Sequence, residues 1–200
     1  MGTSYETVLV AAEFDDVVGV VRATGRAALV VPVVAGRVAV IPREEDWGGA
    51  LLKPVALPVS QMLHCPVLTC EVFDSDVVLC SVYEDGRPTH RYVSELEMIV
   101  EWFEDSDGEF KARLDGKVLP PDQLPKGALG ADAAAFAPFA VGDADLGAID
   151  AALRNVDGSS SAEEQHEAIL RALGLPVEAL TVAFRHVRGG QFADAVGLNL

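Results

Sequence analysis

The pattern of apolar and polar positions predicts strands and one helix at the start of the chain. Residues 7–12 form a short, almost unbroken apolar run, which is typical of a buried strand. Residues 14–23 follow with two aspartates near their start, where the first turn of a helix favours negative charge. Two β-branched runs, at residues 27–33 and 37–41, are joined by a short link and predict a hairpin. The chain therefore opens with the order β-α-β-β.

The strongest strand pattern lies at residues 67–94, where three runs rich in β-branched residues follow one another. Polar residues 74–76 separate the first two runs, and the dipeptide Asp85-Gly86 separates the second from the third. Asp-Gly between such runs is a strong signal for a two-residue hairpin loop, so we predict an antiparallel meander. The expected register around this loop pairs Glu84 with Arg87, Val82 with Thr89 and Val78 with Val93.

The segments on either side of the meander are predicted to be partly helical. Between residues 44 and 66, glycines and prolines interrupt any long helix, so we expect a loop with one short helix around residues 59–63. After the meander, Ser94 and Glu97 match a capping box. The sequence therefore predicts a short amphipathic helix that covers part of the sheet, with helical spacing of Ile99, Trp102 and Phe103.

The second half of the chain predicts a small hairpin and then helices. Asp115-Gly116 is a second Asp-Gly pair and predicts a hairpin over residues 110–118. Residues 119–142 are rich in Pro, Gly and Ala and predict a long surface crossing with one helical turn near residues 133–136. Three further helices are expected, at residues 144–154 capped by Asp143, at residues 162–173 capped by Ser161, and at residues 177–187 after Pro176.

Together these elements predict an α+β fold. An antiparallel or mixed sheet of about five to seven strands would be partly covered by helices. We expect a sheet domain over residues 1–118, a crossing over residues 119–142, and a helical C-terminal section, residues 143–200, packed on the sheet domain. A chain of 200 residues is long enough to bury a core without disulfides or a metal ion.

The charge of the chain is concentrated in one region. Of the net charge of −16, residues 71–109 contribute −10, because twelve acidic residues face only Arg87 and Arg91 there. Such a cluster repels itself, and its benefits are solubility, steering of cationic partners or cation binding. We therefore favour a non-catalytic interaction protein for a basic protein partner, for example an inhibitor or immunity protein for a basic enzyme. The candidate partner-binding residues are Glu84, Asp85, Glu101, Trp102, Phe103, Glu104, Asp105 and Asp107.

Charge and composition also limit other partners and the location. A pI near 4.5 argues against nucleic acid, which is recognised through basic surface. The predicted helices at residues 162–173 and 177–187 could suggest a helix-turn-helix, but the second offers a thin basic face. No stretch approaches about 18 uninterrupted apolar residues, so we expect no membrane span and a cytoplasmic location. The oligomeric state stays open.

The central hairpin offers an alternative site, for a small-ligand-binding or divalent-metal-binding domain or for an enzyme. It gathers aromatic side chains, a histidine that could act as a general base and arginines that could bind an anion. No G-x-S-x-G context and no Gly-rich phosphate loop accompany them, so no catalytic residue is assigned. The residues of this alternative site are Tyr83, Arg87, His90, Arg91 and Tyr92.

Two groups of residues could hold a metal ion by type, although neither a metal site nor a cofactor is predicted. The acidic turn at residues 104–109, with Asp74 and Asp76 elsewhere, offers oxygen ligands. An EF-hand spacing fails, because it would place Phe103 and Leu114 at ligand positions. The second group lacks the CxxC pairs of usual zinc sites and consists of His64, Cys65, Cys70 and Cys80.

The sequence predicts structural roles for the cysteines and for one histidine. Three cysteines are an odd number and do not predict a disulfide framework, so reduced thiols are expected. Cys70 and Cys80 alternate with valines along predicted strands, which favours burial as small apolar residues. His166 is flanked by three glutamates and is expected to be a solvated helix residue.

Overall fold

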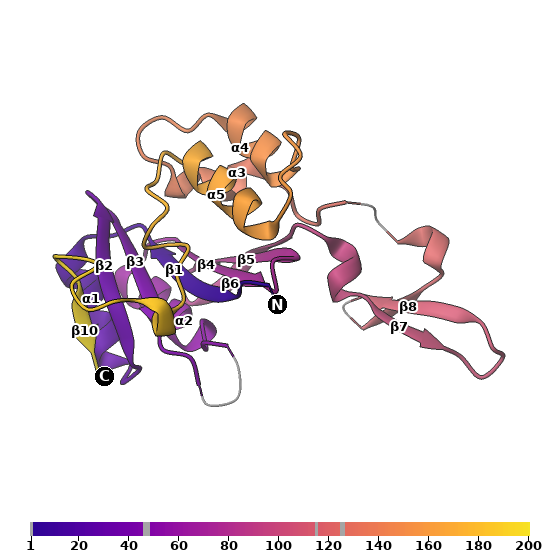
Figure 1. Ribbon diagram of the computed structural model, residues 1–200, viewed down its shortest axis with the longest axis horizontal. Coiled ribbons are helices and arrows are strands. Elements are labelled where there is room, and N and C mark those ends of the chain that lie inside the picture. The colour runs from indigo at the N-terminus through magenta and orange to yellow at the C-terminus, as the bar shows by residue number, and fades with distance from the viewer. Residues whose placement is uncertain (1, 46–48, 115, 125–126) are drawn as a thin grey trace.

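The computed structural model describes residues 2–45, 49–114, 116–124 and 127–200, and within them the chain forms an α+β fold (Figure 1). A seven-stranded sheet has the order β10-β2-β3-β1-β4-β5-β6, and a three-stranded sheet has the order β7-β8-β9. All neighbouring strands pair antiparallel. The predicted class, the β-α-β-β start and the central meander are thus confirmed. The strands are β1 (Tyr5–Val10), β2 (Ala28–Val34), β3 (Arg37–Pro42), β4 (Val67–Phe73), β5 (Val77–Glu84), β6 (Arg87–Val93), β7 (Glu101–Glu104), β8 (Phe110–Leu114), β9 (Lys117–Leu119) and β10 (Val196–Leu198).

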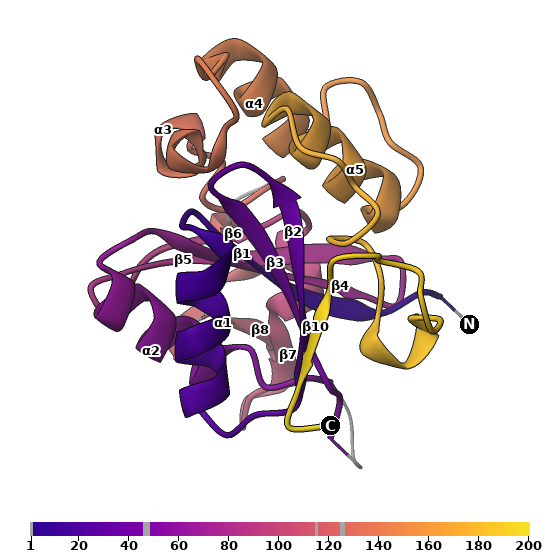
Figure 2. The same ribbon diagram turned by 90° about the vertical axis from the view of Figure 1, so that its left-hand side faces the viewer.

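Helices cover both faces of the seven-stranded sheet, as Figures 1 and 2 show. Helices α1 and α2 pack on one face and α3, α4 and α5 on the other, so the sheet lies between two hydrophobic cores. Successive side chains of a strand point to opposite faces, so Val8 of β1 joins the first core and Leu9 the second. The helices are α1 (Phe14–Ala23), α2 (Lys53–Leu63), α3 (Ala133–Phe136), α4 (Leu146–Leu153) and α5 (Ala162–Ala172), with 3₁₀ turns at Leu96–Ile99, Pro121–Gln123, Ala137–Phe139 and Phe184–His186.

The register of the β5–β6 hairpin is only partly as predicted. The two residues that flank the Asp-Gly loop pair with each other as expected. Beyond them the register shifts by one residue, so Val82 lies opposite His90 instead of Thr89. The extra residue forms a β-bulge next to Pro88, which has no N–H to join a regular ladder and lies in an edge strand.

Helix α2 is longer than the short helix predicted at residues 59–63, because it begins at Lys53. Pro54 lies in its first turn, where no backbone N–H has to be paired within the helix. Pro58 lies inside the helix, and the carbonyl of Pro54 is the group that loses a hydrogen bond there. Together the two prolines therefore remove only one backbone hydrogen bond, and they do not end the helix.

The prediction of an amphipathic helix after Ser94 is wrong. The Ser94 hydroxyl accepts a hydrogen bond from the N–H of Val78 at 2.9 Å, so it binds the sheet instead of capping a helix. Only one 3₁₀ turn follows before β7 begins at Glu101. Trp102 and Phe103 consequently lie on opposite faces of a strand, not on one face of a helix.

The segment of residues 95–128 is here called the arm, and its described residues project from the body of the protein (Figure 1). Strands β8 and β9 of the arm form the hairpin predicted at residues 110–118, and Asp115 of its loop lies outside the described residues. The two ends of the arm meet, because the Val93 N–H donates to the Leu129 carbonyl at 3.0 Å and the Leu129 N–H donates back at 2.8 Å. The arm is therefore an insertion whose entry and exit lie side by side.

Helix α5 begins as predicted, but the environment of His166 is not the expected one. The Ser161 hydroxyl accepts a hydrogen bond from the Glu164 N–H at 3.3 Å and caps the helix. His166 is completely buried, so the expectation of a solvated histidine is wrong. It shares one face of the helix with Ile169 and Leu170, and that face packs into the core.

Residues 177–187 do not form the predicted third helix. In a helix, the carbonyl of Leu180 would accept from the N–H of Phe184, but here the Thr7 hydroxyl donates to it at 3.0 Å. This segment instead crosses the sheet in turns and leads to β10, which pairs with β2 and was not predicted. The C-terminal section thus adds an edge strand to the sheet as well as helices.

Helix α4 provides a direct test of its N-terminal cap. It begins at Leu146, and Asp145, not the predicted Asp143, accepts from the N–H groups of Gly147 and Ala148 at 3.0 Å each. We expect Asp145→Ala to lower the free energy of unfolding by about 1 kcal/mol, because those N–H groups lose their acceptor. Chemical denaturation measures the effect. Asp143→Ala is the matched control, and an equal loss in both variants would contradict the assigned cap.

Candidate functional site

The three strands of the arm have two distinct faces, which the register defines. Residues directly opposite each other in an antiparallel sheet point to the same side. Trp102 lies opposite Ala112, and Glu101 lies opposite Arg113, so these two pairs occupy different faces. The mostly apolar face, here called the apolar face, contains Trp102, Phe110, Ala112, Leu114 and Leu119 together with the charged residues Glu104 and Lys117, and the ionic face contains Glu101, Phe103, Lys111, Arg113 and Val118.

The apolar face of the arm is only partly covered. Leu96, Val100 and Ala112 are buried together in a small core of their own at the base of the arm. Farther out, Trp102 is 46 % exposed and Phe110 is 64 % exposed. The two aromatic residues are diagonal neighbours across β7 and β8, a spacing of about 7–8 Å that aromatic side chains can bridge. They form an exposed aromatic pair that the body of the protein does not cover.

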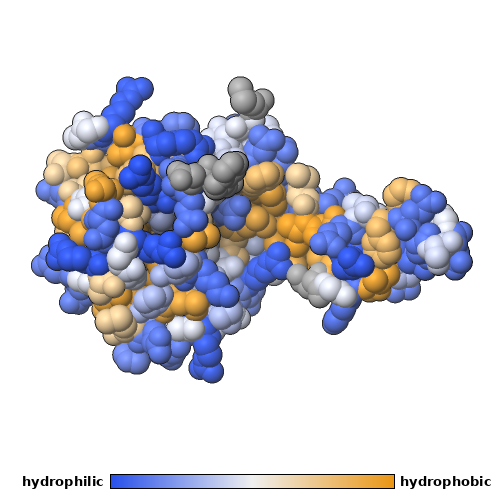
Figure 3. Space-filling model, turned by 90° about the horizontal axis from the view of Figure 1, so that it is seen from below, coloured by the Kyte–Doolittle hydropathy of each residue, from blue (hydrophilic) through white to orange (hydrophobic). Residues whose placement is uncertain are grey.

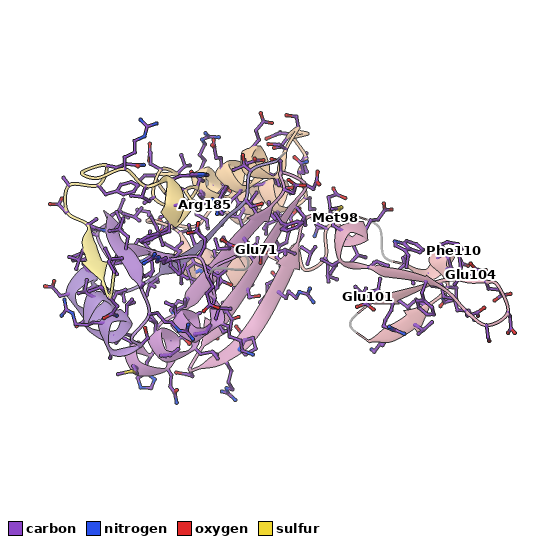
Figure 4. The ribbon with its side chains drawn as sticks, turned by 60° about the horizontal axis from the view of Figure 1, so that its bottom comes forward. Glu71, Met98, Glu101, Glu104, Phe110 and Arg185 are labelled. Carbon is purple, nitrogen blue, oxygen red and sulfur yellow. The ribbon has the colours of Figure 1, made fainter. Side chains whose placement is uncertain are left out.

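Apolar surface continues from this pair toward the body. Figure 3 shows hydrophobic residues where the arm joins the body and along the arm. Met98, which Figure 4 marks where the arm leaves the body, is 49 % exposed. Exposed apolar groups that lie close together, with polar residues around them, are typical of a binding surface.

The ionic face contains the paired charges of the arm. Arg113 binds Glu101 at 3.1 Å and places its guanidinium carbon 4.9 Å from the centroid of the Phe103 ring. Lys111 binds Asp105 and lies 3.7 Å from Glu109. Two arm cations are therefore engaged with acids of the same arm.

The β7–β8 turn is organised by Asp105. One oxygen of its carboxylate accepts from the N–H groups of Asp107 and Glu109, each at 3.0 Å. The hydrogen bond from Lys111 lowers the pKa of Asp105, and the backbone N–H donors lower it further. This carboxylate is already satisfied within the turn, and the described residues contain no group of three His, Cys, Asp or Glu that could hold a metal ion.

The arm is acidic despite these ion pairs. Its sequence contains nine acidic and four basic residues, which gives a net charge of −5. Glu104 and Asp107 are exposed at the β7–β8 end of the arm. Figure 4 shows Glu104 and Phe110 close together on the arm. The aromatic pair is thus accompanied by unburied negative charge.

The predicted partner-binding residues are divided between two places. Six of them belong to the arm, whereas Glu84 and Asp85 lie at the β5–β6 turn of the main sheet. There Asp85 lies 3.0 Å from His64, and the Gly86 N–H donates to the Ser60 hydroxyl at 3.1 Å. This turn is therefore attached to the end of α2 and is not part of the arm.

The alternative ligand-binding residues lie on both faces of the sheet. His90 and Tyr92 point toward α3, where both rings meet Phe136 edge-on. The His90 Nε2–H donates to the Gly130 carbonyl at 2.7 Å. Tyr83 packs into the core on the other face, next to α1 and α2. Strand alternation therefore separates side chains that are close together in the sequence.

A second acidic group lies on the body and was not singled out in the sequence. Glu6 of β1 lies directly opposite Glu71 of β4, and Glu44 nearby binds Arg185 at 2.9 Å (Figure 4 marks Glu71 and Arg185). Glu6 is buried, and this burial raises its pKa, as does the negative charge of Glu71 and of Glu44. Burial also raises the pKa of Glu71. Only strand pairing brings these acids together.

The raised pKa of Glu6 predicts a pH-dependent gain of stability in Glu6→Gln. The pKa of this carboxyl is higher in the folded state than in the unfolded state, where it is about 4.3. Its contribution to stability is therefore fully present below the unfolded pKa, and this contribution is lost as the pH rises through the folded pKa. We therefore expect the variant to be more stable than the wild type at pH 7 and not at pH 4, measured by urea unfolding. Glu178→Gln, at an exposed position, is the control. A gain of equal size at both pH values would contradict the mechanism.

Comparison with known proteins found no family model, no curated protein and no solved structure that matches this chain. None of the helices in the described ranges has the length and apolar character that a membrane crossing requires. The function must therefore be inferred from the chemistry of the molecule's own surfaces.

Proposed function

We propose that this protein is a non-catalytic interaction module whose arm binds a partner protein with a basic surface. The observation that supports it most strongly is the exposed aromatic pair Trp102 and Phe110 on a projecting, acidic arm. A few residues that become buried at the centre of an interface contribute most of its binding energy, and Trp is enriched among them. Surrounding charges increase the association rate and select the partner.

The charge of the chain favours a different protein over a second copy of this one. Two copies, each with a net charge of −16, would bring like charges together if their arms met. A partner with lysines and arginines around an apolar centre would complement both features of the arm. An inhibitor or immunity protein for a basic enzyme of the cytoplasm is one concrete form of this proposal.

The insertion of the arm allows a clean test. Val93 and Leu129 are hydrogen-bonded neighbours, so a short Gly-Ser link can replace residues 95–128 without crossing the body. Tagged wild-type and arm-less proteins are incubated with native lysate at low and high salt, and stoichiometric retained proteins are identified. We expect a basic protein that the wild type retains at low salt and the arm-less variant does not. Unchanged melting of the body checks that the variant is folded.

Binding measurements with the purified protein and its purified partner then test the contribution of Phe110 directly. We expect Phe110→Ala to weaken binding at least tenfold, or about 1.4 kcal/mol, because its ring is the most exposed part of the pair. Phe73→Ala is the matched control, since Phe73 is a 54 % exposed phenylalanine on the body. Retention of the partner by the arm-less variant, or retention of acidic proteins only by the wild type, would contradict the proposal.

A further inference from the structure

Two thiols face each other in the core between the sheet and α5. Cys70 of β4 lies directly opposite Cys80 of β5, and their sulfur atoms are 3.6 Å apart. Both side chains are buried, and both cysteines are free thiols. The alternation with valines that predicted two buried cysteines also places them on the same face of the sheet.

The backbone around the two cysteines has the geometry that a disulfide needs. The Ser94 N–H donates to the Val78 carbonyl, so the peptide groups of Val78 and Cys80 point toward β6 and not toward β4. Cys70 and Cys80 are consequently a non-hydrogen-bonded pair. The Cα atoms of such pairs are about 4.5 Å apart, within the range of about 4.4–6.8 Å found in disulfides. Side-chain rotation alone can therefore bring the sulfur atoms into bonding distance.

Further polar groups accompany the thiols in this otherwise apolar core. His166 of α5 is completely buried, and its Nδ1 lies 2.9 Å from the hydroxyl of Tyr5. Its Nε2 is also buried and has no hydrogen-bond partner among the residues that the structure describes. Buried polar groups are normally paired, so an unpartnered ring nitrogen beside two thiols calls for an explanation. The same imidazole acts electrostatically on the thiol of Cys70.

The surroundings make the two thiols chemically different. The hydrogen bond from Cys80 lowers the pKa of Cys70 and the charge of His166 lowers it further, while burial opposes both effects. The same hydrogen bond, together with burial, raises the pKa of Cys80. One sulfur is thus suited to act as the nucleophile and the other as the thiol that resolves its oxidised form.

We propose that Cys70 and Cys80 are a peroxide-reactive pair that forms a reversible disulfide within the folded protein. The Cys70 thiolate attacks one oxygen of hydrogen peroxide, the O–O bond breaks, and hydroxide leaves as Cys70 becomes a sulfenic acid. The Cys80 sulfur then attacks the Cys70 sulfur, the S–O bond breaks, and the oxygen leaves as water once the Cys80 proton is transferred. In total, two thiols and one peroxide give one disulfide and two waters.

The burial of the pair decides which oxidant can react. Both sulfur atoms lie beneath α5, so an oxidant must enter through a small local opening of the packed helix. Hydrogen peroxide is uncharged and close to water in size, whereas oxidised glutathione is a charged peptide that such an opening excludes. Selectivity for the small oxidant is therefore part of the proposal.

The test uses the folded protein with Cys65→Ser, which removes the remaining thiol. After treatment with hydrogen peroxide and removal of the excess, we expect a loss of about 2 Da in intact mass, a peptide that links residues 70 and 80, and reversal by dithiothreitol. Oxidised glutathione under the same conditions should give less than a tenth of this product. Absence of the linked species with peroxide, or equal yields with both oxidants, would overturn the proposal.

A second variant guards against an artefact of unfolding. Cys80→Ala in the same background removes the resolving thiol and keeps an apolar group in the core. We expect this variant to give no loss of 2 Da after peroxide treatment of the folded protein, and to form a dimedone adduct at Cys70 when it is then unfolded in the presence of dimedone. If the linked species of the parent forms only in urea, and never under conditions where its circular dichroism is native, the pair is structural and the proposal fails.

Discussion

Phe136→Ala is expected to lower the free energy of unfolding by about 3–5 kcal/mol, the largest single effect that this structure predicts. Phe136 is completely buried, and its ring meets Tyr92 and His90 edge-on, with centroid distances of 5.8 and 6.2 Å. Its helix, α3, has only four residues and cannot be stable by itself. Loss of this ring therefore leaves a cavity and removes an apolar contact between α3 and the sheet.

Urea unfolding of wild type and variant, analysed with equal slopes, measures the loss at Phe136. Phe73→Ala removes the same side chain from a position that is 54 % exposed, and we expect it to cost less than about 1 kcal/mol. A loss at Phe136 as small as the loss at Phe73 would show that the cavity collapses without cost, which would contradict this prediction.

Arg37→Ala is expected to lower the free energy of unfolding by about 2 kcal/mol, because one guanidinium holds several carbonyls. Its Nε donates to Phe139 at 3.0 Å, and its Nη2 donates to Ala140 at 2.7 Å and to Pro138 at 3.1 Å. These carbonyls follow α3 and lie about a hundred residues away in the sequence, whereas Arg37 begins β3. The side chain therefore fastens the α3 segment to the β2–β3 hairpin.

Arg37→Lys separates geometry from charge. An ammonium group keeps the positive charge but cannot direct several fixed N–H groups at carbonyls in different positions. We expect lysine to recover less than half of the stability lost in Arg37→Ala, as measured by thermal and urea unfolding. Full recovery by lysine would mean that charge alone is responsible.

Much of the fold follows from local patterns in the sequence. β1 is buried on both faces, so its side chains are apolar without alternation and the strand is easily recognised. The Asp-Gly loop at Asp85 and Gly86 carries its own turn chemistry, and the predicted hairpin is present. The cap at Ser161 is likewise local, because donor and acceptor are three residues apart.

Other predictions failed where a local signal met a distant partner. Ser94 has the pattern of a helix cap, but its hydroxyl is taken by Val78 of the neighbouring strand. The segment after Pro176 has helical spacing, but Thr7 occupies one of the carbonyls that the helix would need. β10 has only three residues, too few for a periodic pattern.

The arm itself is not predicted by the sequence, but some of its candidate residues are, because charge is visible in a sequence. The acidic residues and Trp102 were singled out, but the exposure of Phe110 and the separation of the arm from Glu84 and Asp85 depend on the fold. The pairing of Glu6 with Glu71 depends equally on register between strands distant in the chain. Short-range hydrogen bonding cannot encode such a pairing.

The α+β class, the order of the first strands and the location of the negative charge follow from the amino-acid sequence alone, because periodicity, turn chemistry and composition act over a few residues. The projection of the arm from the body and the meeting of Cys70 with Cys80 beneath α5 depend on the complete fold. These features arise when segments far apart in the chain bury a common surface, and no local pattern specifies which segments will meet.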